Sequence, residues 1–518
     1  METSQRQVAR AAALVMVAFA FSRLLGLVRQ IVFGAYFGTG PEMDAYVAAI
    51  RIPDTIFLVV AGGALGSAFI PLFTGRLARG ERTEAWRLAS AIVSILVAVL
   101  APVSLICIIV APWLMGTFVA PALAPDVQAR AVEVMRVMLI SPTIFGISGI
   151  VMGALNAHQH FLLPAVAPIV YNLSLIVGGI IGGVTPAGAM APAVGMVVGA
   201  VGHLAVQIPG LVRYGARFVP TFGRGDAGVR EVGFLIAPRV LGMAAAQVNM
   251  IVSSNLASRL GPGSLSALEI AWRIMLLPQG VFAQAVGTAV FPTFSEQASL
   301  GDRDALGQTL ANALGMLIAL TIPASVGLIM LGEPIVVTMF QRGAFDAGSS
   351  EVVAWVLGFF ALGLVGHSAL EVLGRAFYAL HDTWTPAMAA VVAVVLNGLL
   401  GLLLPGVLAG LGLMPLGGLA LATALAALVE TAVLFILIRR RLGEFSGRAL
   451  WGTTARVCAA SLAMAVALWA FVEAGPVSPY LQALVGIPVG VVVYVAVAWA
   501  LGLSQLKMAF RMVASRAR

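Results

Sequence analysis

The stretch GSAFIPLF, residues Gly66–Phe73, returns 221 positions later as GTAVFPTF, residues Gly287–Phe294. At the same spacing, Gly80–Arg82 (GER) returns as Gly301–Arg303 (GDR). A second set recurs 222 positions apart: Ala154, Ala157, Pro164 and Ala165 with Ala376, Ala379, Pro386 and Ala387. Blocks that agree on one spacing over such a distance indicate a duplicated unit of about 220 residues, and in a membrane protein this is the usual plan of a transporter.

The composition is that of an integral membrane protein. The chain is 60% hydrophobic and 10% charged, with a mean hydropathy of +1.02, whereas soluble domains have roughly 25% charged residues. Apolar runs long enough to cross a bilayer core of about 30 Å follow one another from end to end. The segment after the polar start, Met1–Arg10, carries arginines and no cleavage pattern, so we expect no cleavable signal. Cys107 and Cys458 lie in apolar runs and are expected to be small buried hydrophobes.

Fourteen membrane-spanning helices are predicted, in an all-α fold. We place them near 9–36, 43–73, 86–112, 131–156, 161–184, 188–212, 230–257, 265–294, 304–330, 350–380, 384–408, 414–438, 450–473 and 480–504. The repeat relates the second helix to the eighth and the fourth to the tenth. Six helices per copy is an even number, so the copies are parallel and not inverted. We therefore divide the chain into an N-lobe (1–222), a C-lobe (223–441) and two additional helices with a basic C-terminus (442–518).

The arginines predict the orientation. The loops on the N-terminal side hold most of them, while the opposite side offers only Arg130, Arg259 and Arg342. The positive-inside rule then puts both termini in the cytoplasm. The net charge of +8 is mostly a topology signal, and no basic domain with interleaved aromatic residues supports nucleic-acid binding.

Charged residues inside the apolar runs are the candidate site. The first expected helix carries Arg23 and Arg29, and the second carries Asp44 and Arg51, which share a helical stripe because they are seven residues apart. Arg273 lies inside the eighth. A charge near the middle of the bilayer costs a few kcal/mol on insertion scales, so each of these residues requires a cavity or a partner.

Local pairing separates structural from functional candidates. Glu371 and Arg375 stand four residues apart, which favours a structural ion pair, and Glu269 is similarly placed to pair with Arg273. No acid lies within four residues of Arg23 or Arg29. Unpaired arginines that face a common cavity suit a multiply anionic ligand, because guanidinium groups bind phosphate oxygens in a bidentate manner and stay charged. The secondary candidates are Ser22, Glu269, Arg342 and Arg375.

Several chemistries have no motif in the sequence. No helix combines two histidines with a carboxylate at a metal-binding spacing, and no Asp-rich diphosphate motif or Gly-rich phosphate loop occurs. We therefore expect a transporter and not an enzyme, with no metal and no cofactor. Its energy must come from an ion gradient, the membrane potential or the substrate itself.

Five segments together resemble the MurJ (MviN) family of lipid II flippases. They are Ser22–Arg29, Asp44–Tyr46, Gly63–Pro71, Phe340–Phe345 (FQRGAF) and Arg375–Ala379 (RAFYA), the last continuing through Asp382-Thr383 to Thr385-Pro386. Each motif is short, but their order along the whole chain is specific.

The resemblance implies the fold of the multidrug/oligosaccharidyl-lipid/polysaccharide exporter superfamily: two six-helix lobes in a V around a cationic cavity, and a final helix pair that lines a groove for a polyprenyl tail. It implies lipid II as the substrate, moved across the bacterial inner membrane from the cytoplasmic to the outer leaflet for cell-wall synthesis. Carried over by position, Arg23, Arg29 and Arg273 match the family's cavity arginines and Asp44 its essential acid. We expect a monomer whose partners are lipid II and membrane lipids.

The sequence also departs from the family pattern. An arginine pair and a glutamate that the family often has in the second helix are replaced by Phe57, Leu58 and Gly62. Arg51 is the residue that could compensate. Acids of a sodium site found in some members are replaced by the neutral Ser253 and Gly401, although Asn397 is present. These changes argue against a sodium site of that design.

Three alternatives stay open on the residues alone. A drug or cation antiporter of the same superfamily would need a buried carboxylate, for which Asp44 is the strong candidate. Another oligosaccharide-lipid flippase would have similar cavity needs. A membrane enzyme that acts on polyprenyl diphosphates would need paired acids and a metal.

Overall fold

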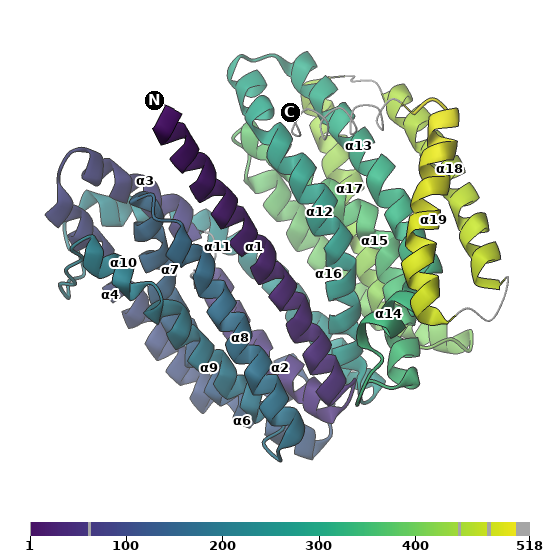
Figure 1. The fold of residues 1–518 in the computed structure, drawn as a ribbon, viewed down its shortest axis with the longest axis horizontal. Coiled ribbons are helices and arrows are strands. Elements are labelled where there is room, and N and C mark those ends of the chain that lie inside the picture. The colour runs from purple at the N-terminus through teal and green to yellow at the C-terminus, as the bar shows by residue number, and fades with distance from the viewer. Residues whose placement is uncertain (1, 61–63, 444–446, 474–477, 504–518) are drawn as a thin grey trace. The chain divides into compact units, whose positions relative to one another are not determined.

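The computed structural model describes residues 2–60, 64–443, 447–473 and 478–503, and the elements assigned in these ranges are helices (Figure 1). Eleven of the described helical segments are long and apolar enough to cross a membrane. The expected class, an all-α integral membrane protein, is therefore confirmed. Three expected spans are not among the eleven: α1, α2 with α3, and α11. The first two carry Arg23, Arg29, Asp44 and Arg51.

The helices follow one another along the chain in this order. The first half consists of α1 (Glu2–Phe37), α2 (Pro41–Val60), α3 (Ala64–Ala78), α4 (Arg82–Ile109), α5 (Ala111–Leu114), the π-helix η1 (Met115–Val119), α6 (Pro125–Met138), α7 (Ser141–Ala157), α8 (Leu162–Val184), α9 (Met190–Ala205), α10 (Ile208–Arg213) and α11 (Ala227–Ala257). The second half consists of the 3-10 helix η2 (Ser258–Leu260), α12 (Ser264–Ser299), α13 (Arg303–Met330), α14 (Gly332–Phe340), α15 (Ala347–Ala379), α16 (Trp384–Gly410), α17 (Leu416–Leu442), α18 (Gly447–Glu473) and α19 (Pro479–Ala500).

Some expected helices are divided. The second expected span, 43–73, consists of α2 and α3, and residues 61–63 between them lie outside the described residues, as does Gly62. The fourth consists of α6 and α7, and Pro142 in the first turn of α7 fits a helix start because it has no N–H to donate. The basic C-terminus after residue 503 also lies outside the described residues.

The chain forms two compact units. The first contains Met1–Ser266 together with Arg342–Phe345, and the second contains Ala267–Gln341 and Asp346–Arg518. The lobe boundary expected from the repeat, after residue 222, stays a prediction. By contacts, α11 belongs with the first unit, where it packs on α2 and α3.

The first unit is built around glycine-mediated helix contacts. Helix α8 packs against α9 and also against α1, the purple helix that runs beside it in Figure 1. A side chain added at Gly179 of α8 would come within 2.6 Å of the Phe33 ring. Small residues therefore allow the close approach of α1 to α8.

The second unit has two apolar clusters. One lies between α13, α15 and α17 and includes Leu310, Leu373 and Phe377. The other joins α13 to α18 and α19, which are drawn in yellow in Figure 1, and includes Leu468 and Tyr494. The Tyr494 hydroxyl donates a hydrogen bond to the Ala319 carbonyl at 2.6 Å, so the last helix pair is fixed to α13 by a polar contact as well.

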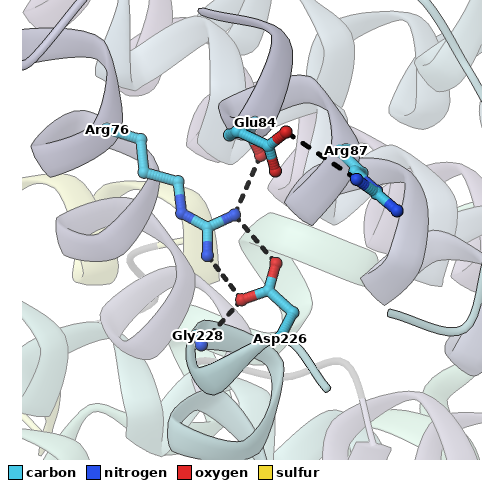
Figure 2. A network of polar contacts seen from close by, with 5 residues as sticks. All are labelled: Arg76, Glu84, Arg87, Asp226 and Gly228. Carbon is cyan, nitrogen blue, oxygen red and sulfur yellow. Dashed lines mark hydrogen bonds and ion pairs between the residues drawn. The ribbon is translucent and has the colours of Figure 1, made fainter. Parts of the chain in front are cut away.

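A polar network ties the end of α3 to the start of α11 (Figure 2). Arg76 donates to both carboxylate oxygens of Asp226, at 2.9 and 2.5 Å, and to the Glu84 carbonyl at 2.9 Å. Asp226 also accepts from the Gly228 backbone N–H at 2.8 Å, which makes it the N-cap of α11. One carboxylate thus fixes two elements that are distant in the sequence.

The loop segment Arg342–Phe345 belongs to the first unit because it lies against the end of α1. The Ala344 N–H donates to the Ala35 carbonyl at 2.8 Å. Gly343 has φ +60°, and a Cβ there would come within 2.2 Å of the same carbonyl oxygen. Only glycine satisfies both conditions.

Candidate functional site

Helix α1 carries two arginines at the heart of the predicted site. The Arg23 side chain is exposed and that of Arg29 is half-buried, and the described part of the chain shows no hydrogen bond or ion pair to either guanidinium. Six residues separate them, about 9 Å along a helix axis. Both cations are therefore available to an anionic ligand. Ser22, beside Arg23, is half-buried.

Asp44 is buried, with 1% of its surface exposed. Its carboxylate accepts from the Gly263 backbone N–H at 2.6 Å and from the Ser266 N–H at 2.9 Å, and the Ser266 hydroxyl donates to it at 2.7 Å. These donors belong to the start of α12, where N–H groups lack helical partners and the helix dipole favours an anion. Among the described residues, the partners of Asp44 are thus the residue before α12 and its first turn, and not an arginine.

Arg51, two turns after Asp44 on the same face of α2, contacts α11. Its Nε donates to the Ser254 hydroxyl at 2.8 Å, so this arginine links two helices of the first unit. Ser254 follows Ser253, the neutral residue at a position that is acidic in some family members.

Arg273 lies on α12 in the second unit. It pairs with Glu269 one turn earlier, with the Arg273 Nη2 atom 2.6 Å from the Glu269 Oε1 atom, as the four-residue spacing predicts. The Arg273 side chain remains 39% exposed, so the guanidinium can also meet a ligand. Arg273 follows Arg51 by 222 positions, which is the repeat spacing, so both copies hold an arginine at the equivalent point.

The secondary candidates take different places. Arg375 donates to Glu371 at 2.7 Å and to the Thr288 hydroxyl at 3.0 Å, and the expected ion pair on α15 is thereby confirmed. Arg342 is exposed in the segment against α1. The first unit holds Ser22, Arg23, Arg29, Asp44, Arg51 and Arg342, and the second holds Glu269, Arg273 and Arg375.

An apolar groove lies within the second unit. It has a volume of about 400 Å³ and is lined by α12, α13, α14, α18 and α19. Its walls include Phe282, Pro323, Leu468, Gly490 and Val491. Both final helices contribute to its lining.

Gly263 and Ser266 are site residues that sequence reasoning missed. The run Gly261–Ser264 (GPGS) before α12 is a turn and helix-start signal. That signal predicts unpaired N–H groups at this point, but it does not predict which acid binds them. Among the described residues, no three His, Cys, Asp or Glu side chains gather as a metal site would need.

The duplicated sequence, the apolar helices and the buried charges define a membrane transporter with two related halves. Solved transporters share this fold. An inward-facing multidrug resistance MATE family transporter of the MOP superfamily matches 84% of this chain and 96% of its own at 17% identity and a TM-score of 0.68. A structure described as lipid II flippase MurJ in an inward closed conformation matches 94% of this chain and 98% of its own, at 26% identity and a TM-score of 0.78.

Sequence comparison specifies the family. The family model described as lipid II flippase MurJ matches residues 33–482. A probable lipid II flippase MurJ from Rhizobium tropici is 30% identical over 426 residues, which cover 81% of this chain and 79% of the relative. Its counterpart from Thermotoga maritima is 31% identical over 381 residues, which cover 73% and 75%. The chain belongs to the MurJ family of lipid II flippases.

Proposed function

We propose that the protein translocates lipid II from the cytoplasmic to the outer leaflet of the bacterial inner membrane, for peptidoglycan synthesis. Family membership supports this substrate. The observation in the molecule that carries the proposal is the pair of available guanidinium groups on α1, Arg23 and Arg29. Cations in apolar helices are costly, and a diphosphate is the kind of ligand that offsets this cost.

In this mechanism Arg23 and Arg29 bind the diphosphate together with Arg273, which belongs to the second copy of the repeat. The two copies rock relative to each other in alternating access. The ligand selects one state because it binds that state more tightly, as any population shift requires. The lipid tail lies in the apolar groove of α13, α18 and α19, where Val491 and Leu468 provide hydrocarbon contacts.

The coupling energy in this proposal is the membrane potential or an ion gradient. In the sodium-site region, the Thr423 hydroxyl donates to the Asn397 side-chain oxygen at 3.3 Å, while positions 253 and 401 are serine and glycine. Without the two carboxylates this region lacks the negative charge that favours a bound sodium ion. We further propose fourteen spans in two lobes of six and an additional pair, both termini in the cytoplasm, and a monomer in the membrane.

Alanine variants of Arg23, Arg29 and Arg273 test the proposal. Each should fail to support growth of a flippase-depleted bacterial strain while it reaches the membrane at the level of the unchanged protein. Arg79→Ala is the matched control, because Arg79 is 62% exposed and its one ion pair with a described residue is to the exposed Glu81. Growth with all three variants would overturn the assignment of these arginines.

Incubation of the purified protein with labelled lipid II, with and without Mg²⁺, separates a flippase from an enzyme. We expect binding without bond cleavage, because no metal-binding motif is found in the sequence. Release of phosphate or of the disaccharide-pentapeptide would favour a polyprenyl-diphosphate enzyme.

A further inference from the structure

A second groove lies between α16 and α17 of the second unit, and it shares no lining residue with the groove of α18 and α19. It has a volume of about 370 Å³. Apart from Thr385 and Glu430, its lining is apolar, with residues such as Val392 and Val433. Met388, Val392 and Trp384 on its rim are 54%, 60% and 65% exposed. A molecule dissolved in the membrane can therefore reach the groove from the side.

Glu430 is an unusual wall residue. It lies inside the apolar span Leu416–Leu442, and it is half-buried. No hydrogen bond or ion pair joins its carboxylate to another of the described residues. An acid at membrane depth is costly and marks a functional site unless it is paired within the protein.

Two basic side chains, one on α17 and one on the neighbouring helix α15, have other partners. Arg441, at the end of α17, donates to the Thr385 hydroxyl at 3.1 Å and is paired with Asp382 at 2.5 Å. On α15, which also packs against α17, Arg375 is paired with Glu371. The Glu430 carboxyl group thus has no basic partner among the described residues and is available to a molecule that enters the groove.

The depth and the lining restrict the ligand. Arg441 follows Glu430 by eleven residues, about 16 Å along the helix, so a phospholipid headgroup beside Arg441 stays well short of the carboxylate. A metal ion requires several oxygen ligands, and the lining side chains supply one carboxylate and the Thr385 hydroxyl, which already donates to Asp382 at 2.6 Å. Apolar walls with a single acid fit an organic cation whose charge is spread over a hydrophobic body.

We propose that the groove between α16 and α17 binds lipophilic organic monocations from the membrane, with Glu430 as the counter-ion. This function is separate from the handling of lipid II. Val392 and Val433 contact the apolar body of the ligand, and Trp384 at the rim presents an aromatic face to a cation that enters.

Binding of tetraphenylphosphonium to the full chain in nanodiscs of zwitterionic lipid tests the proposal, with empty nanodiscs subtracted. Tetraphenylborate, which has the same shape and the opposite charge, is the probe control. Glu430→Gln keeps the shape of the side chain and should weaken tetraphenylphosphonium binding at least about tenfold, because loss of one partner of a desolvated charge pair costs at least that much. Glu351→Gln, an exposed acid near the start of α15, should bind as the unchanged protein does.

Val392→Trp fills the groove without a change of charge and should weaken binding as well. The proposal is overturned if the unchanged protein binds no more tetraphenylphosphonium than empty nanodiscs, or binds tetraphenylborate equally well. Undiminished binding by Glu430→Gln would also overturn it. Loss of binding by Glu430→Gln but not by Val392→Trp would place the cation outside this groove and reject the proposed site.

Discussion

Ser266 donates two hydrogen bonds to the Asp44 carboxylate, one from its backbone N–H at 2.9 Å and one from its hydroxyl at 2.7 Å. The two residues are 222 positions apart, so Ser266 is the counterpart of Asp44 in the second copy of the repeat. Equivalent positions of the two repeat copies are thus in direct contact, and an acid in one copy accepts hydrogen bonds from the helix start in the other. This relationship gives Asp44 a structural role that can be measured.

Asp44→Ala should lower the stability of the protein by about 2 kcal/mol, because buried N–H donors of Gly263 and Ser266 lose their acceptor. Asp44→Asn keeps one acceptor oxygen and should cost less. The unfolding midpoint, followed by fluorescence-detected size exclusion on heating, measures both. Asp126→Ala, at an exposed acid, is the control. If Asp44→Ala has the same unfolding midpoint as the control, the hydrogen bonds to Asp44 contribute nothing to stability.

The pair of Arg76 and Asp226 should give the protein a pH-dependent contribution to stability. The Arg76 guanidinium, hydrogen-bonded to the carboxylate, holds the pKa of Asp226 below its ordinary value of 3.8. A lowered folded-state pKa stabilises the fold fully above the unfolded value, and this stabilisation is lost as the pH falls through the folded value.

Asp226→Asn should therefore lower the free energy of unfolding at pH 7 by about 1–3 kcal/mol, and the melting temperature with it. The melting temperatures of the variant and of the unchanged protein should converge as the pH falls below 4. Glu81→Gln, which breaks the exposed pair with Arg79, should change little at any pH. A difference between Asp226→Asn and the unchanged protein that persists undiminished at acid pH would exclude ionic pairing as the cause.

Val491→Trp should obstruct the apolar groove, since Val491 lines it and is 56% exposed. We expect weaker binding of full-length lipid II and unchanged binding of a short-chain analogue, which places less hydrocarbon in the groove. Val492→Trp is the control, because Val492 is 67% exposed on the same helix and does not line the groove. Native mass spectrometry measures the affinities. Equal losses with both lipids would indicate that the substitution disturbs the headgroup site instead.

Gly343→Ala should destabilise the segment that lies against α1. Gly343 and Gly412 both have positive φ, so alanine strains the backbone by a similar amount, about 1 kcal/mol, at either position. Only at Gly343 would the added Cβ also meet a backbone oxygen, that of Ala35 at 2.2 Å, whereas Gly412 has open space. Thermal unfolding should therefore show a larger loss for Gly343→Ala. Equal losses would mean that the loop moves away from α1 without cost.

The membrane class, the long helices and the local ion pairs followed from the sequence. Runs such as Trp384–Gly410 are apolar enough to require a lipid surrounding, and pairs such as Glu371 with Arg375 are fixed by helical spacing alone. The short breaks, by contrast, were not predicted. The division at residues 139–140 between α6 and α7 lies just before Pro142, a local helix-start signal that apolar periodicity does not include.

The sequence by itself determined which basic side chains lie within apolar segments, because Arg23, Arg29 and Arg273 interrupt apolar runs whatever their neighbours are. Only the tertiary structure decided which charged side chains have hydrogen-bond or ion-pair partners. Asp44 is satisfied by α12, Asp226 by Arg76, and Glu430 lines an apolar groove. The physical reason is the distance along the sequence between the residues that are in contact. Helical periodicity sets contacts within about four residues, while these partners come together only when elements distant in the chain pack against each other.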